Sequence, residues 1–137
     1  MLHHGLSPLN SRKYPMAAAL SSMALCTIAA ALVASNVLAI AFISAAMFLG
    51  YMASSSAWAM ASVAAPANCT ASLGSMQNFG GYLGGALAPM ITGFIVQGTG
   101  SFVPALLFGA GVGLVCAIGY LIIIREPITA AELGVEA

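Results

Sequence analysis

Four polar or aromatic side chains interrupt otherwise apolar stretches of this sequence: Ser55, Trp58, Gln77 and Asn78. A hydroxyl, an indole N–H and two carboxamides can form hydrogen bonds, and an indole ring can also stack on a small ligand. None of the four is an ordinary acid or base near neutral pH, so their chemistry is recognition of a polar molecule. We therefore predict a binding surface and not a catalytic centre.

Two of these residues belong to a stripe made of Tyr51, Ser55, Trp58 and Ser62. Their spacing of i, i+4, i+7 and i+11 puts all four on one face of a helix. A polar and aromatic stripe on an apolar helix suggests a surface that lines a cavity. The alternatives are that Trp58 belongs to an interfacial aromatic belt and that the serines bond to carbonyls of the preceding turn.

Trp58 and Asn78 are equally distant along the chain from Asn68, which lies in a turn-rich loop. At about 1.5 Å of rise per residue, both should lie roughly 10–15 Å inside a membrane whose hydrocarbon half-thickness is about 15 Å. A tryptophan at that depth is too deep for an aromatic belt, and a carboxamide there needs a partner. We expect both residues at the same level, with Gln77 about 100° round the helix from Asn78.

The helix that carries Asn78 is also rich in glycine. Gly80 with Gly84, and Gly81 with Gly85, form small-xxx-small pairs, which let helix backbones approach closely in membranes. Pro89 removes the hydrogen bond to the carbonyl of Gly85 and should kink the helix. We predict close packing at the glycines and a kink at the proline. A span interrupted by Gly and Pro is typical of a transport pathway, with a tightly packed structural helix as the alternative.

The elements that hold these residues must be membrane helices. From Tyr14 to Ile124 the chain contains no Asp, Glu, Lys, Arg or His; 61% of all residues are hydrophobic, 4% are charged and the mean hydropathy is +1.04. A soluble domain is about 25% charged. The apolar runs are continuous and do not alternate, which favours helices over a β-barrel. The sequence predicts an all-α integral membrane protein.

The apolar run divides into four spans, since each span needs about 20 residues. Polar or turn-rich breaks separate expected helices at 15–34, 37–64, 73–97 and 101–124, which lie between an amino-terminal segment 1–14 and a tail 125–137. Arg12 and Lys13 precede the first span and Arg125 follows the last. By the positive-inside rule both ends are expected in the cytoplasm, and an even number of spans agrees with that.

Other kinds of chemistry find no support in the sequence. Cys26, Cys69 and Cys116 lie far apart in apolar surroundings, so we interpret them as small hydrophobes and not as metal ligands or a disulfide framework. No zinc motif and no general base for a serine nucleophile occurs between residues 14 and 124. No basic patch suits nucleic acid. We expect no enzyme activity, no cofactor, no bound metal and no nucleic-acid partner; the surroundings are the lipid bilayer.

Two stretches of the chain resemble a known family. The segment from Met76 to Gly93, MQNFGGYLGGALAPMITG, and the segment from Thr99 to Ala105, TGSFVPA, resemble the eleventh and twelfth helices of major facilitator transporters. The similarity is greatest to the anion:cation symporter family, which includes hexuronate, glucarate, galactonate and tartrate carriers. Residues 5–15 look like the end of that family's cytoplasmic loop between its eighth and ninth helices.

The resemblance implies that the four spans are the last four helices of a twelve-helix major facilitator fold in a bacterial inner (plasma) membrane. It implies proton-coupled symport of an organic anion such as a sugar acid. Ser55, Trp58 and Asn78 would contact the anion, with Gln77 adjacent. The family's carboxylate-binding arginine and acidic coupling residues belong to an amino-terminal half that is not in this sequence. We therefore expect a carboxyl-terminal fragment that does not transport alone. The alternative is a self-contained four-helix interaction or assembly subunit.

Overall fold

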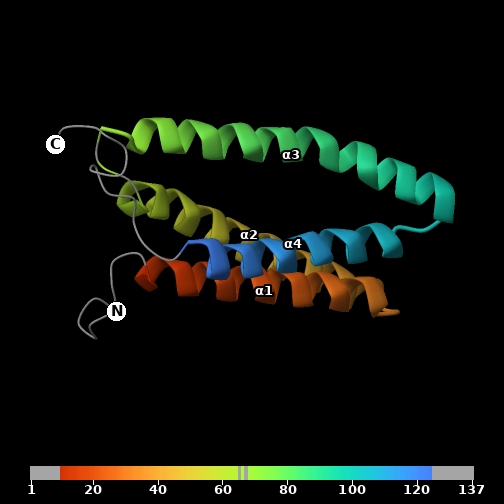
Figure 1. The fold of residues 1–137 in the computed structure, drawn as a ribbon. Helices are drawn as coiled ribbons and strands as arrows, with labels where there is room; N and C mark the ends of the chain where they lie inside the picture. The colour runs from red at the N-terminus through yellow and green to blue at the C-terminus, as the bar shows by residue number, and fades with distance from the viewer. Residues whose placement is uncertain (1–9, 65, 67, 125–137) are drawn as a thin grey trace.

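The computed structural model describes residues 10–64, 66 and 68–124, and this part of the chain is helical and contains no strand. Its helices are α1 (Asn10–Leu32), α2 (Asn36–Ala64), α3 (Thr70–Thr99) and α4 (Val103–Ile123). Each helix runs antiparallel to the one before it (Figure 1). All four are long and apolar enough to cross a membrane. The predicted all-α membrane architecture is confirmed.

The helix ends differ in detail from those expected from charge and turn residues. α1 begins at Asn10, so Arg12 and Lys13 lie within its first turns and not in a separate segment before it. Arginine and lysine favour helix as much as most apolar residues do, so a helix can continue beyond the stretch that is apolar. α3 extends to Thr70 and Thr99, and α4 begins only at Val103. Residues 1–9 and the tail 125–137 lie outside the described residues.

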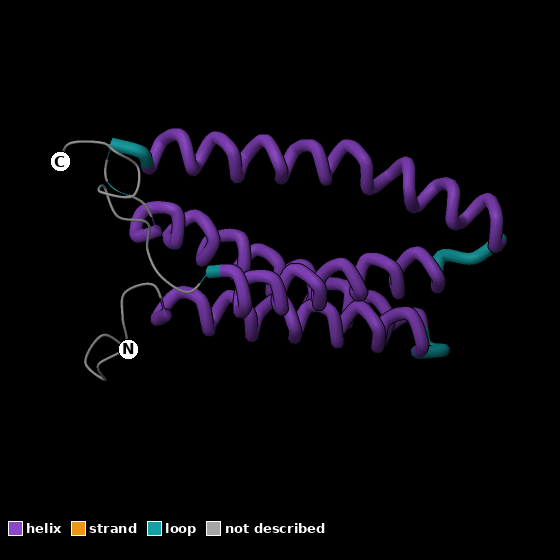
Figure 2. The backbone as a smooth tube through the Cα atoms, viewed as in Figure 1, coloured by secondary structure: helices purple, strands orange, loops and turns teal. Residues whose placement is uncertain are grey.

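α1 is the centre of the packed part of the molecule, because it lies against both α2 and α4 (Figure 2). The residues of this interface are small: the buried apolar side chains are alanines together with Met16 and Met60. Small side chains let helix backbones approach closely, which is the main source of helix association in a membrane. Met16, Ala19, Ala53 and Met60 form one buried cluster between α1 and α2.

Met23 of α1 fills a notch between two glycines of the neighbouring helices. A Cβ atom added to Gly50 of α2 would lie 3.2 Å from Met23 Sδ, and one added to Gly113 of α4 would lie 3.1 Å from Met23 Cε. Both distances are shorter than ordinary van der Waals contact. The absence of a side chain at these two positions therefore allows Met23 to lie between α2 and α4.

The end of α4 is held by a residue from the start of α1. Lys13 is only 7% exposed, and its Nζ atom donates a hydrogen bond of 2.6 Å to the carbonyl oxygen of Ile124, the C-cap residue of α4. The last carbonyls of a helix have no partner within the helix, and a cation suits the negative end of the helix dipole. The amino-terminal end of α1 and the carboxyl-terminal end of α4 are thereby joined at one end of the bundle.

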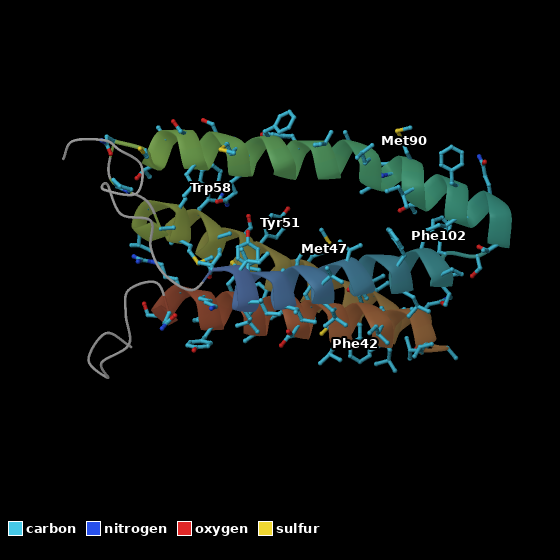
Figure 3. All side chains as sticks on the ribbon, viewed as in Figure 1. Phe42, Met47, Tyr51, Trp58, Met90 and Phe102 are labelled. Carbon is cyan, nitrogen blue, oxygen red and sulfur yellow. The ribbon has the colours of Figure 1, made fainter. Side chains whose placement is uncertain are left out.

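α3 is the least packed helix, and none of its residues is buried. Figure 1 shows it standing apart from α1, α2 and α4 over most of its length. Its second half bends toward α4, and the bend begins near Met90, which is labelled in Figure 3. Pro89 lies within the helix at this point and supplies the physical cause, since it cannot donate to the carbonyl of Gly85. Gly100, with a φ of 68°, then ends α3 in the left-handed conformation.

Candidate functional site

The predicted site residues lie on two neighbouring helices, Ser55 and Trp58 on α2 and Gln77 and Asn78 on α3. Trp58 makes the closest connection between them. A Cβ atom added to Gly74 would lie 3.5 Å from Trp58 Cζ3, so the indole ring touches α3 at this glycine. Figure 3 shows Trp58 and Tyr51 projecting from α2 toward α3. The ring is 49% exposed, which leaves half of its surface open to a ligand or to lipid.

The contact between Trp58 and Gly74 joins two surface stripes along the helices. On α2 the stripe is Tyr51, Ser55, Trp58 and Ser62; on α3, residues that share a face with Gly74 are Asn78, Gly81 and Gly85. Trp58 therefore lies level with Gly74, and Asn78 lies four residues, about 6 Å along the helix axis, farther from the loop. The prediction that Trp58 and Asn78 lie at the same level is wrong by about one turn. We name the surface formed by these two stripes the α2–α3 seam.

Ser55 makes the local contact that we considered as an alternative to a cavity role. Its Oγ atom donates a 2.9 Å hydrogen bond to the carbonyl of Met52, and Ser56 donates to the same carbonyl at 3.0 Å. Ser62 bonds in the same way to Ala59. The hydroxyl of Ser55 still has its acceptor lone pairs free for a ligand, and the residue is exposed on the seam.

Asn78 is exposed on α3, and its carboxamide has no hydrogen-bond partner among the described residues. An unpaired carboxamide is costly in the hydrocarbon region of a bilayer, at roughly 2–7 kcal/mol depending on the reference state. A polar partner from outside this part of the chain would remove that cost. Asn78 is thus the seam residue with the strongest physical need for a ligand or a further protein group.

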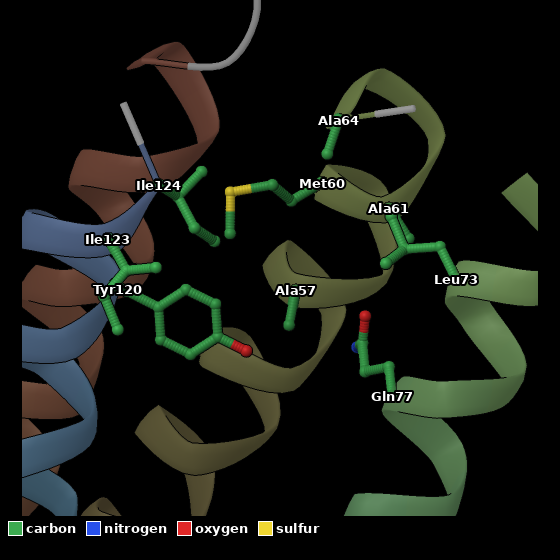
Figure 4. A pocket seen from close by; sticks show the side chains of 9 residues that line it. All are labelled: Ala57, Met60, Ala61, Ala64, Leu73, Gln77, Tyr120, Ile123 and Ile124. Atoms are coloured by element: carbon green, nitrogen blue, oxygen red, sulfur yellow. The ribbon is translucent and has the colours of Figure 1, made fainter. Parts of the chain in front are cut away.

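Gln77 faces a different space from Ser55. It lines a pocket of about 390 Å³ between α2, α3 and α4, whose other lining residues are Ala57, Met60, Ala61, Ala64, Leu73, Tyr120, Ile123 and Ile124 (Figure 4). Ala57 and Ser55 are about 200° apart around α2, so the pocket and the seam lie on different sides of that helix. The structure brings Trp58 and α3 together, but it does not bring Gln77 to Ser55.

Tyr120 is a pocket residue that the sequence analysis does not name as a site residue. Figure 4 shows its ring directed from α4 toward Ala57 of α2, and the residue packs against the buried cluster of α1 and α2. A signal was available: Ala110, Gly113 and Ala117 are the buried residues of α4 near it, and their spacing of three and four continues to Tyr120. The inward face of α4 could therefore have been extended to this residue.

The four paired glycines of α3, unlike Gly74, make no packing contact within the described chain. A Cβ atom added to Gly80, Gly81, Gly84 or Gly85 would meet no atom within 4 Å. The close packing predicted for them stays a prediction, since any partner surface would have to come from a different arrangement or from additional protein. Within the described residues no group of three or more His, Cys, Asp or Glu side chains could hold a metal ion.

Sequence comparison supplies the class of protein. The chain is 36% identical over 124 residues to a probable L-galactonate transporter of Escherichia coli, covering 90% of this chain. It is 30% identical over 129 residues to a hexuronate transporter of Bacillus subtilis, covering 94% of this chain. A D-galactonate transporter of Escherichia coli is 34% identical over 79 residues, which is 58% of this chain. No model of a known protein family matches, and no solved structure does.

The matched stretch covers 27% of the length of the L-galactonate transporter, 18% of the D-galactonate transporter and 30% of the hexuronate transporter. Four helices that are long and apolar enough to cross a membrane, together with these relatives, define the class: an integral membrane protein related to transporters. More narrowly, the chain is a homologue of the galactonate and hexuronate transporters, which are sugar-acid transporters of the major facilitator superfamily. The resemblance found in the sequence is confirmed.

Proposed function

We propose that this chain forms the carboxyl-terminal four-helix part of a secondary active transporter, a proton-coupled symporter of a sugar acid. The observation that carries the proposal is the 36% identity to a galactonate transporter over 90% of the chain. The seam of polar and aromatic residues between α2 and α3 is compatible with it, because small-molecule sites are formed by a few polar groups in apolar surroundings. The membrane would be the bacterial inner membrane, with both ends of the chain in the cytoplasm.

In this proposal Trp58, Ser55 and Asn78 contact the sugar acid from the seam. The indole ring would pack against the C–H groups of the sugar chain, and the hydroxyl and carboxamide would bond to its hydroxyl groups. Asn78 carries most of the specificity, since its carboxamide has no partner among the described residues and can serve the ligand alone. Gln77 would lie next to them in the chain, with its side chain in the adjoining pocket.

Two functions of such a carrier need groups that residues 14–124 do not contain. A carboxylate needs a cation to pair with, and proton coupling needs a group that gains and loses a proton near neutral pH. This stretch has no Lys, Arg, His, Asp or Glu. Further protein, corresponding to the unmatched length of the relatives, would supply both. Four helices alone would therefore bind weakly and would not transport.

The first test is an immunoblot of native membranes with an antibody against the segment Thr129–Ala137. Because the matched stretch covers 27% and 30% of two relatives, a transporter should give a band roughly three times larger than 13.7 kDa. Vesicles from the same cells should then take up galactonate or a hexuronate when a proton gradient is imposed. Uptake that is insensitive to the gradient would remove proton coupling from the proposal.

A band near 13.7 kDa would favour the second candidate, a four-helix interaction or assembly subunit. The observation that speaks for this candidate is the open glycine face of α3, which could accept a helix of another protein. Cross-linking in native membranes would then show a complex larger than the chain, and uptake would be unaffected by deletion of the gene.

A further inference from the structure

A cleft separates α3 from the rest of the bundle, and two pockets occupy it. The first is the pocket of about 390 Å³ that Gln77 and Tyr120 line. The second has a volume of about 310 Å³ and lies farther along between α3 and α4; its lining includes Gly84, Ala88, Thr92, Ala105 and Gly109. Seven of the nine residues around the first pocket are Ala, Leu, Ile or Met. Such walls suit neither water nor a polyhydroxy acid, since few polar groups are available to replace lost hydrogen bonds.

The two walls of the second pocket match each other as helix-packing surfaces. Gly84 and Ala88 on α3 are one turn apart, and so are Ala105 and Gly109 on α4. These are two small-xxx-small pairs that face the same cavity, the pattern that brings membrane helices into close contact. As the structure stands, a Cβ atom on Gly84 or Gly109 would meet no atom within 4 Å. The two surfaces are complementary but separated.

A polar pair lies across the first pocket. Figure 4 shows the carboxamide of Gln77 and the hydroxyl of Tyr120 directed toward each other, on either side of Ala57. Neither side chain has a hydrogen-bond partner among the described residues. Each group can both donate and accept, so the two can satisfy one another. Approach of α3 to α4 would bring this about, and the cost of two unpaired polar groups in an apolar pocket favours that approach.

We propose that α3 closes against α4, so that Gly84 and Ala88 pack on Ala105 and Gly109 while Gln77 bonds to Tyr120. The arrangement seen here is then the open state of a two-position helix. Two features permit the movement: the bend at Pro89 and the left-handed Gly100 between α3 and α4. Hinges of this kind concentrate the change at a few positions near the end of an element. Gln77 lies less than one turn from Gly74, so the contact of Trp58 with Gly74 rearranges as α3 closes.

Disulfide formation distinguishes the open state from the closed state. A disulfide needs Cβ atoms about 3.5–4.5 Å apart, so the pair Gly84→Cys and Gly109→Cys can join only if α3 closes. Cys26, Cys69 and Cys116 are first replaced by alanine. The full chain is then oxidised in native membranes. The loss of maleimide-reactive thiols is measured in the chains that are not joined to another chain by a disulfide. We expect cross-linking of the pair within minutes.

The chain offers a matched control on helices that already touch. A Cβ atom on Gly113 would lie 3.8 Å from Ala24 Cβ, so the pair Ala24→Cys and Gly113→Cys should join without any movement. Because a side chain at Gly113 crowds Met23 Cε, Met23→Ala is added to both cysteine pairs to make room. If this control joins and the pair at 84 and 109 does not, the closed state does not exist and the proposal is overturned.

The polar pair is tested in the same background. Gln77→Leu and Tyr120→Phe each remove one partner while they keep most of the volume. Loss of one neutral hydrogen bond should lower the closed population, and with it the initial cross-linking rate at 84 and 109, roughly two- to tenfold. Tyr82→Phe, on the exposed surface of α3, is the matched control and should leave the rate unchanged. A rate that is equal in all variants would overturn the role of Gln77 and Tyr120.

Discussion

Lys13 and Ile124, at the two ends of the long uncharged run, are joined by a hydrogen bond of 2.6 Å from the lysine Nζ atom to the isoleucine carbonyl oxygen. The lysine is almost fully buried, so its ammonium group bonds to the end of α4 in place of water. Sequence reasoning interpreted Lys13 only as a signal for cytoplasmic orientation. The structure gives the same residue a second role, as a cap for a helix that is distant in sequence.

Loss of this cap should destabilise the bundle. We expect Lys13→Met to lower the free energy of unfolding by roughly 1–3 kcal/mol, because a hydrogen bond to a charged group and a favourable interaction with the helix dipole are lost together. Lys13→Arg should retain most of the stability. Unfolding of the purified chain in mixed micelles, followed by circular dichroism, measures the difference. Arg12→Gln serves as the control, and equal loss in both variants would assign the effect to net charge.

The notch that holds Met23 should not tolerate a larger residue at Gly113. Gly113→Val places new methyl groups where Met23 Cε now lies, and overpacking of this kind costs roughly 1–3 kcal/mol. The double variant with Met23→Ala should recover part of the loss, because the notch is then empty. Gly80→Val is the control at an open position. Thermal stability in detergent gives the comparison, and additive losses in the double variant would mean that the two residues do not share one space.

Trp58 is the only tryptophan in the chain, so its fluorescence reports one position. If the residue lies deep in the membrane, lipids brominated near the ends of their acyl chains should quench it more strongly than lipids brominated near the headgroup. The expectation follows from a depth of roughly 10–15 Å at about 1.5 Å per residue. Stronger quenching by the shallow lipids would make Trp58 a member of the interfacial belt.

Substitution of Asn78 should impair uptake more than substitution of Ser55. In the carrier that contains this chain, Asn78→Ala should raise KM for the sugar acid roughly tenfold, because a ligand group loses its only partner on α3. Ser55→Ala should have a smaller effect, since its hydroxyl already donates to Met52. Ser56→Ala is its matched control, because Ser56 donates to the same carbonyl but lies on another face.

The outcome for Asn78 separates binding from folding. Its side chain has no partner among the described residues, so its removal should leave the free energy of unfolding unchanged or slightly higher. A carrier with normal KM after Asn78→Ala would exclude this residue from the substrate site. A carrier that no longer reaches the membrane would instead indicate that Asn78 pairs with another helix of the protein.

Much of the architecture could be predicted from the sequence, and part of the site could not. The helices follow from apolar length. The level of the residues did not follow as closely: the sequence predicts Trp58 beside Asn78, whereas the structure places Trp58 against Gly74, one turn nearer the loop. The sequence predicts Asn78 at the substrate site with Gln77 adjacent, about 100° round the helix. That rotation directs Gln77 into the pocket with Tyr120 and leaves Asn78 on the seam.

The sequence by itself determined the class of protein, because an uncharged run of this length is stable only in lipid and because local motifs carry the family resemblance. It also determined the number of helices, since bilayer thickness sets the length of each span. Only the tertiary structure decided that Lys13 caps α4, that Met23 lies between Gly50 and Gly113, and that α3 stands apart. These contacts join distant residues across helix faces, and such pairings depend on packing geometry that no local pattern contains.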